Sequence, residues 1–130
     1  RDRVIAAAND PYTAIVMERS SPVRIAVVAT DECIGRLLED FLAVSGWGAV
    51  TLDPKVGVRE LERIEGCSLV LCDLDLHPSK LEVVRRGGVP LIGFSSSLPL
   101  RDVHIPADVA AAFELPPNWA ELRALIRSVL

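Results

Sequence analysis

The amino-acid sequence predicts an α/β fold with three layers, in which helices cover both faces of a five-stranded parallel sheet. Short runs of apolar and β-branched residues alternate with segments whose apolar residues recur every three or four positions. The clearest run, residues 68–72, ends at Asp73 and is typical of a strand buried on both faces. Crossovers between parallel strands are right-handed and place helices on both faces, so this alternation predicts a doubly wound sheet.

The expected strands occupy residues 24–29, 49–52, 68–72, 89–94 and 110–115. The first helix is expected to begin at Asp31, since aspartate is a preferred N-cap residue, and to end before Gly46. Its apolar residues have helical spacing and predict one buried face: Ile34, Leu37, Leu38, Phe41 and Leu42.

Two further helices are expected after the second and third strands. The first carries Val58, Leu61 and Ile64 on one face, and the second spans residues 79–86 and stops at a glycine pair. Between the fourth and fifth strands, by contrast, two prolines leave room for at most a short helix. Helix four of the fold is therefore expected to be shortened or missing. A last helix is expected after Asn118, a capping residue type.

The composition limits the organisation of the chain and its partners. Residues 1–22 end in Ser-Ser-Pro and are interpreted as an N-terminal extension or linker before one domain of residues 23–130. The chain opens without methionine, which fits a piece of a longer protein. A net charge of -4 without a dense basic cluster predicts that this domain does not bind nucleic acid. The short apolar runs predict no membrane span, and a cytoplasmic location is expected.

The cysteines and glycines match no common catalytic or metal-binding pattern. Three cysteines without C-x-x-C spacing favour neither a disulfide framework nor a zinc site. The sequence has neither a Gly-rich phosphate loop nor a Gly-x-Ser-x-Gly elbow. The domain is therefore not expected to be an enzyme.

The candidate functional residues follow the strands, because ligands bind at the carboxyl ends of strands in such sheets. Thr30 and Asp31 follow the first strand, Asp73 and Asp75 follow the third, and Ser95 and the two serines after it follow the fourth. These side chains are expected to border one pocket.

The segment from Leu69 to Leu74, with Asp73 at the strand end, is similar to the third strand of response-regulator receiver domains. The chain resembles this CheY-like family, which has a flavodoxin-like fold, over residues 24–130. The resemblance implies that Asp73 accepts a phosphoryl group from a histidine kinase. It implies that Ser95 occupies the position of the Thr or Ser that hydrogen-bonds this group, and that Leu115-Pro116 is a candidate cis peptide.

The sequence also departs from the family pattern. Ala29 and Thr30 occupy the positions of the two adjacent acids that hold Mg²⁺ in the family, while Asp31 is displaced. Leu115 stands in place of the lysine and Ala112 in place of the switch aromatic. An acyl phosphate forms on a carboxylate only where cations offset the charge of the phosphoryl oxygens. Phosphorylation is therefore expected to be impaired or absent.

These departures predict an atypical receiver, or pseudo-receiver, in two-component-type signal transduction or transcription regulation. Such a domain is expected to act through a protein partner or an attached effector domain, without a cofactor. In the family, the face of helix four, strand five and helix five binds partners or pairs protomers, so a homodimer through this face is also expected. Trp119 is the candidate anchor there, because tryptophan is enriched at interface hot spots.

Two other functions remain open at this stage. One is a working phosphoacceptor in which Asp73 is phosphorylated with Mg²⁺ and Asp31 or Glu32 supplies a further metal ligand. The other is a regulatory domain that binds a small ligand above Asp73 and Ser95. Each candidate residue also has a structural interpretation. Asp31 would cap a helix, Asp73 would bind loop amides, and Ser95 would end a strand. Trp119 would pack the start of the last helix.

Overall fold

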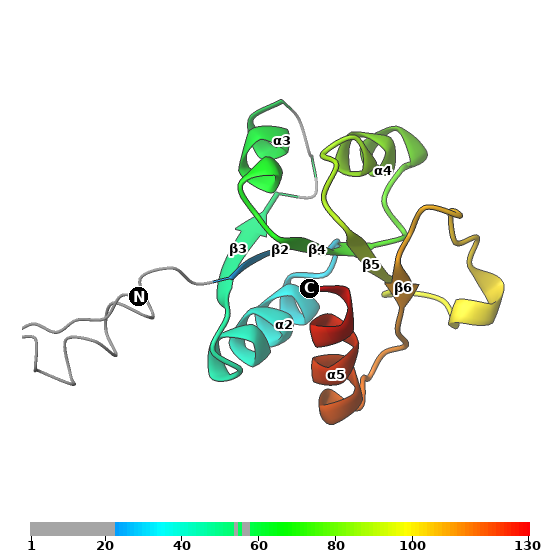
Figure 1. Cartoon of the computed structure of the whole chain (residues 1–130). Helices are drawn as coiled ribbons and strands as arrows, with labels where there is room; N and C mark the ends of the chain where they lie inside the picture. Colours follow the sequence, from blue (N-terminus) through cyan, green and yellow to red (C-terminus); the bar gives the residue numbers. More distant parts are fainter. Residues whose placement is uncertain (1–22, 54, 56–57) are drawn as a thin grey trace, which may run out of the picture.

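The computed structural model of the chain describes residues 23–53, 55 and 58–130. The expected extension, residues 1–22, lies outside the described residues. Figure 1 shows a central sheet of five strands in the order β3-β2-β4-β5-β6. All four pairs of neighbouring strands are parallel. The strands are β2 (Arg24–Val28), β3 (Gly48–Leu52), β4 (Leu69–Asp73), β5 (Leu91–Phe94) and β6 (Ala111–Ala112).

Four α-helices cover the sheet in the described part of the chain: α2 (Glu32–Val44), α3 (Val58–Glu65), α4 (Pro78–Arg85) and α5 (Trp119–Val129). Helices α2 and α5 lie on one face, and α3 and α4 lie on the other (Figure 1). The strand order reverses between β2 and β4, which is the switch point of a doubly wound sheet. The predicted three-layer fold is therefore confirmed.

The alternation of side chains along β2 explains the two cores. Ile25 and Val27 pack in the cluster with α2 and α5, while Ala26 and Val28 pack in the cluster on the α3 and α4 face. All four side chains have no exposed surface. Strand β4 is buried along its whole length, as the continuous apolar run before Asp73 predicted.

The expected buried face of α2 is wrong at one position. Leu38, Phe41 and Leu42 are buried, but Leu37 is 57% exposed. Around the helix axis, Phe41 and Leu42 lie within about 60° of Leu38, on either side of it. Leu37 lies about 100° from Leu38, beyond Phe41 and outside this buried face. Leu38 contributes to the core and leaves Leu37 in solvent.

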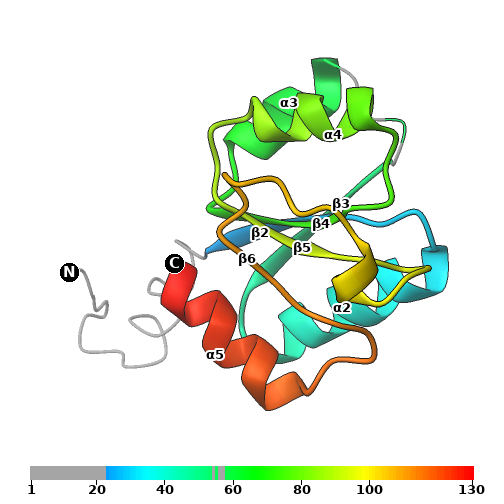
Figure 2. The ribbon, with the colours of Figure 1, turned by 90° about the vertical axis from the view of Figure 1, so that its right-hand side faces the viewer.

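The segment between β5 and β6 differs most from a regular α/β repeat. A single 3₁₀ turn, η1 (Leu100–Asp102), stands where the helix was expected to be shortened or missing, so that prediction is confirmed. Figure 2 shows this segment passing the β5 and β6 edge of the sheet. Strand β6 is shorter than the predicted strand at residues 110–115 and pairs through two residues only. The peptide bond Leu115-Pro116 is cis, as the family resemblance implied. None of the described helices is long and apolar enough to cross a membrane.

Candidate functional site

Asp73 is the last residue of β4 and has no exposed surface. Its Oδ2 atom accepts hydrogen bonds from the Thr30 amide at 3.1 Å and the Thr30 hydroxyl at 2.7 Å. The Ser96 hydroxyl donates a further hydrogen bond to the same oxygen. Its Oδ1 atom accepts from the Asp75 amide at 3.0 Å. The donors described at this buried carboxylate are thus neutral groups of the chain, and both oxygens are engaged.

Asp75, two residues further on, holds the loop after β5. The Ser95 hydroxyl donates to both oxygens of Asp75, at 3.0 and 3.1 Å. The amides of Ser96 and Ser97 donate to Oδ2 at 2.9 and 3.0 Å, and the Ser97 hydroxyl donates to the same atom at 2.9 Å. Burial acts to raise the pKa of the Asp75 carboxyl, but the hydrogen bonds from the three serines outweigh it and lower the pKa below its ordinary value.

The two strand-end acids therefore divide the serine loop between them. The resemblance placed Ser95 beside Asp73, but Ser95 donates to Asp75, and it is Ser96 that donates to Asp73. Ser95 is 5% exposed, and its hydroxyl also accepts from the Leu98 amide at 3.0 Å, which forms a tight turn. Ser96 was expected only as one of three serines in the loop. Its role depends on this turn, which the spacing of the sequence does not show.

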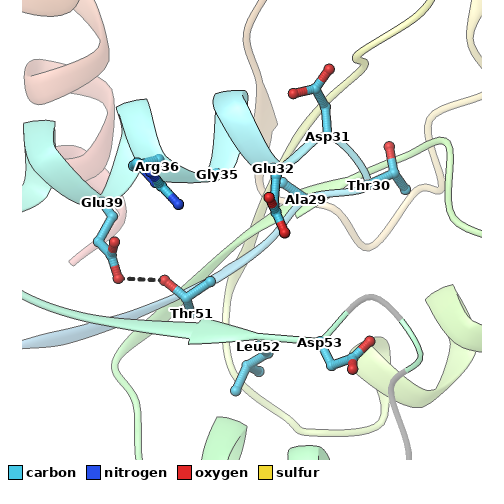
Figure 3. Close-up of a pocket in the computed structure, with 10 residues that line it drawn as sticks. All are labelled: Ala29, Thr30, Asp31, Glu32, Gly35, Arg36, Glu39, Thr51, Leu52 and Asp53. Carbon is cyan, nitrogen blue, oxygen red and sulfur yellow. Dashed lines mark hydrogen bonds between the residues drawn. The ribbon is translucent and has the colours of Figure 1, made fainter.

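Asp31 caps α2. Its Oδ1 atom accepts hydrogen bonds from the Cys33 amide at 2.8 Å and the Ile34 amide at 3.1 Å. In Figure 3 its side chain points away from Asp53 and the end of β3. These hydrogen bonds support the interpretation of Asp31 as a helix cap. In the described part of the chain, no hydrogen bond links Asp31 to Asp73.

The oxygens around Asp73 are a poor fit for Mg²⁺. This ion prefers octahedral oxygen coordination through one or two carboxylates and several waters. Both Asp73 oxygens already accept protein hydrogen bonds, and Asp31 is engaged as a helix cap. Within residues 23–53, 55 and 58–130, no group of three or more His, Cys, Asp or Glu side chains is arranged to hold a metal ion.

Leu115 and Ala112 occupy the positions of the lysine and the switch aromatic of receiver domains. Leu115 contributes to packing, and Ala112 lies in the edge strand β6. Leu115 packs as a partly buried side chain against the cluster on the α2 and α5 face. Ala112 is one of the two residues of β6. Neither side chain carries a charge or a polar group. Position 115, which holds a lysine in the family, thus contributes no cation to the site.

A cavity of about 610 Å³ lies beside the site, between the start of α2 and the ends of β2 and β3 (Figure 3). Thr30 separates it from Asp73, which does not line it. Its walls carry four acidic side chains and one basic side chain: Asp31, Glu32, Glu39, Asp53 and Arg36. Ser95 does not line this cavity either.

Trp119 joins α5 to α2. Its ring lies 4.9 Å from the ring of Phe41, centroid to centroid, and Arg123 stands 5.4 Å from the centroid of the same Phe41 ring. The Arg123 Nε atom also donates to the Ser45 hydroxyl, at 3.3 Å. Packing accounts for one side of Trp119, and 38% of the residue remains exposed. Both interpretations of this residue retain an observation in their favour.

The structure is similar to solved receiver domains over most of its length. A response regulator receiver protein from Burkholderia phymatum has 24% identity and a TM-score of 0.65, covering 82% of this chain and 94% of that chain. A CheY-like receiver domain from Methylobacillus flagellatus has 18% identity and a TM-score of 0.67, with 85% and 100% covered. The receiver domain of a sensor histidine kinase from Pseudomonas aeruginosa, with Mg²⁺ coordinated in its active-site cleft, has 18% identity and a TM-score of 0.67, with 83% and 97% covered.

Two other similar structures are domains of larger proteins. One is the N-terminal domain of a response regulator/sensory box/GGDEF protein from Carboxydothermus hydrogenoformans, and the other is the signal receiver domain of an HD domain-containing protein from Pseudomonas fluorescens. No protein-family model and no curated protein matches the sequence. The likeness is thus one of structure, with TM-scores of 0.65 and 0.67 over 82% to 85% of this chain. The chain has the CheY-like fold of response-regulator receiver domains.

Proposed function

We propose that this domain is a pseudo-receiver in signal transduction, which acts by binding other proteins without phosphorylation of Asp73. The observation that carries the proposal is the state of Asp73, whose two oxygens accept hydrogen bonds from neutral donors while the residue has no exposed surface. A receiver-like fold supports the signalling role, although fold alone does not define a function.

The chemistry of phosphoryl transfer explains why this arrangement argues against it. The attacking carboxylate oxygen must be free to approach phosphorus, and positive charge must offset the phosphoryl oxygens. Here Oδ2 of Asp73 would first have to lose the hydroxyl hydrogen bonds of Thr30 and Ser96. Hydrogen bonds to a charged group contribute about 1.5–3 kcal/mol each. Leu115 and Ala29 carry no charge that would offset the loss of these hydrogen bonds. An inactive phosphoacceptor is the simpler interpretation.

The altered face of the domain is the proposed partner surface. η1 replaces the helix before β6, and a hollow of about 560 Å³ lies between η1, β6 and the first turns of α5. Its lining combines polar groups such as Glu114 and Asn118 with apolar ones such as Leu125. A partner protein or an attached effector domain would bind here, in a cytoplasmic protein. Trp119, which follows the lining residue Asn118 in the chain, is the candidate anchor. The similar receiver domains of larger proteins support an attached effector.

The proposal is tested by treating the full chain with Mg²⁺ and acetyl phosphate, and separately with Mg²⁺ and beryllofluoride. We expect no phosphorylated species by intact-mass spectrometry and no change in the fluorescence of Trp119 and Trp47, because the Asp73 oxygens are engaged.

The variant Asp73→Asn is the matched control, since it keeps the shape of the side chain and removes the nucleophilic oxygen. A mass increase in the wild-type chain that Asp73→Asn abolishes would contradict the proposal. That result would instead support the working phosphoacceptor.

A further inference from the structure

The side of α2 that faces away from the sheet carries an exposed apolar stripe. Leu37 is 57% exposed, Val44 is 84% exposed, and Cys33 is also exposed. These residues are separated by four and seven positions, which places them on one side of the helix. In Figure 1 no labelled helix or strand lies below α2, on the side of the helix away from the sheet. We call Cys33, Leu37 and Val44 the α2 stripe.

The surroundings of the α2 stripe extend its apolar surface and hollow it. Phe41 is one helical turn from Leu37, and Trp119, which is 38% exposed, packs against Phe41. A depression of about 250 Å³ lies on the stripe itself, between Cys33, Leu37 and the charged residues beside them. Exposed apolar groups that gather in this way mark interaction surfaces more often than singly scattered ones do.

Charge on the flank of the α2 stripe is self-complementary. Arg36 and Asp40 are both exposed and, at a spacing of four, lie on the same flank. Among the described residues, neither side chain has a hydrogen bond or ion pair recorded with a neighbour. In an antiparallel helix pair related by a two-fold axis, the same flank of each helix meets the same flank of the other. With the axis near Leu38, midway between Arg36 and Asp40, each Arg36 meets the Asp40 of the second copy.

The same axis also matches the apolar residues. Measured along the helix, Leu37 lies about 1.5 Å from the two-fold axis, so the two copies of Leu37 pack against each other. Cys33 and Val44 have their midpoint within about 1 Å of the same axis, so Cys33 of one copy lies opposite Val44 of the other. One register therefore satisfies both the apolar stripe and the charged flank.

We propose that the α2 stripe binds a second copy of this chain, as an antiparallel α2–α2 pair on a two-fold axis near Leu38. This face differs from the one formed by η1, β6 and α5, and the dimer requires no change at Asp73. One helix on each side makes a small interface, and small interfaces are weak. We expect a dissociation constant of about tens of micromolar.

A charge exchange tests the register. Sedimentation of the full chain over a concentration series should show a reversible dimer. Arg36→Asp places two like-charged pairs in the interface, and Asp40→Arg does the same with the opposite sign. Each should weaken the dimer about tenfold, from two surface pairs at up to about 1 kcal/mol each. The combined variant should restore the wild-type affinity, because each pair is re-formed with its signs reversed.

Arg59→Asp, on the exposed surface of α3, is the matched control and should leave the affinity unchanged. A chain that stays monomeric at every concentration overturns the proposal. So does a dimer that neither single variant weakens, or a combined variant that is no stronger than the single ones.

A disulfide tests the orientation of the helices independently. In the background Cys67→Ser, the variant Val44→Cys should form an intermolecular disulfide with Cys33 on mild oxidation, seen as a dimer on non-reducing gels. Without Val44→Cys no cross-link should form. The two copies of Cys33 would lie about 15 Å apart along the direction of the helices, which is too far for a disulfide. A dimer linked through Cys33 alone would indicate parallel helices and overturn the proposal.

Discussion

At the scale of single residues, the sequence located the important acids but not their partners. Asp73 and Asp75 were predictable as site residues because each follows a buried strand, where parallel sheets gather polar groups. Which serine binds which acid was not predictable from the sequence. The turn at Ser95 sets the directions of the serine side chains that follow, and the spacing of residues does not reveal these directions. The hydrogen bonds from the Thr30 and Ser96 hydroxyls to Asp73 likewise depend on side-chain directions.

Removing the Thr30 hydroxyl should destabilise the fold. Thr30→Val keeps the shape of the side chain and removes one hydrogen bond to the buried carboxylate of Asp73. We expect a loss of about 1–2 kcal/mol in the free energy of unfolding, measured by urea denaturation. Thr51→Val is the matched control, because the Thr51 hydroxyl also binds a carboxylate, that of Glu39, but on the exposed surface. It should cost less than about 0.5 kcal/mol. Equal effects of the two substitutions would refute the special role of Thr30.

The serine loop should weaken in acid. Because the pKa of Asp75 is lower in the folded state than in the unfolded chain, its ionised form stabilises the fold at neutral pH. That contribution is lost as the pH falls through the folded-state pKa, below about pH 4. Asp75→Asn should therefore reduce stability at pH 7 by about 1 kcal/mol, a value discounted for solvent screening, and by progressively less toward pH 3.

The control for this pH dependence is Asp102→Asn, since Asp102 is exposed and makes no side-chain hydrogen bond recorded in the described part of the chain. The free energy of unfolding is measured from denaturation curves at about pH 3, 5 and 7, which lie below and above the usual range of carboxyl pKa values. A difference between wild type and Asp75→Asn that stays constant over this range would contradict the assignment.

At the scale of elements, α2 and the segment before β6 show what patterns can and cannot predict. The cap at Asp31 and the end of α2 follow from residue types with strong local preferences, and both are found. The exposure of Leu37 was missed because a sequence of adjacent leucines does not say which one points toward the sheet. The missing helix four was predictable because proline cannot occupy a helix interior. The brevity of β6 was not, since its pairing depends on neighbours far along the chain.

The cap interpretation of Asp31 predicts an ordering of two substitutions. Asp31→Ala removes the acceptor for the Cys33 and Ile34 amides and should cost about 1 kcal/mol in the free energy of unfolding. Asp31→Asn keeps an acceptor oxygen and should cost only a few tenths of that. Thermal denaturation of both variants, with and without Mg²⁺, provides the measurement. A stabilisation by Mg²⁺ that both variants lose would show Asp31 to be a metal ligand instead.

At the scale of the whole molecule, the fold was more predictable than its chemistry. Strand order and layer arrangement follow from burial and from the handedness of crossovers, which a periodic sequence reveals without any contact being known. The electrostatics of the site depends on a few positions, among them Ala29, Leu115 and Asp31. Their identities indicated missing charge, and the structure adds how the remaining acids bind the chain itself.

The short edge strand β6 has a consequence for the behaviour of the domain in solution. A long, uncovered edge exposes a row of unpaired amide and carbonyl groups that recruit strands from other molecules. Strand β6 has only two residues, Ala111–Ala112, and the chain leaves the sheet directly after them. Only the turn η1 precedes β6, so no full helix covers this side. Because β6 is so short, this edge still offers too small a template for fibre growth or strand exchange.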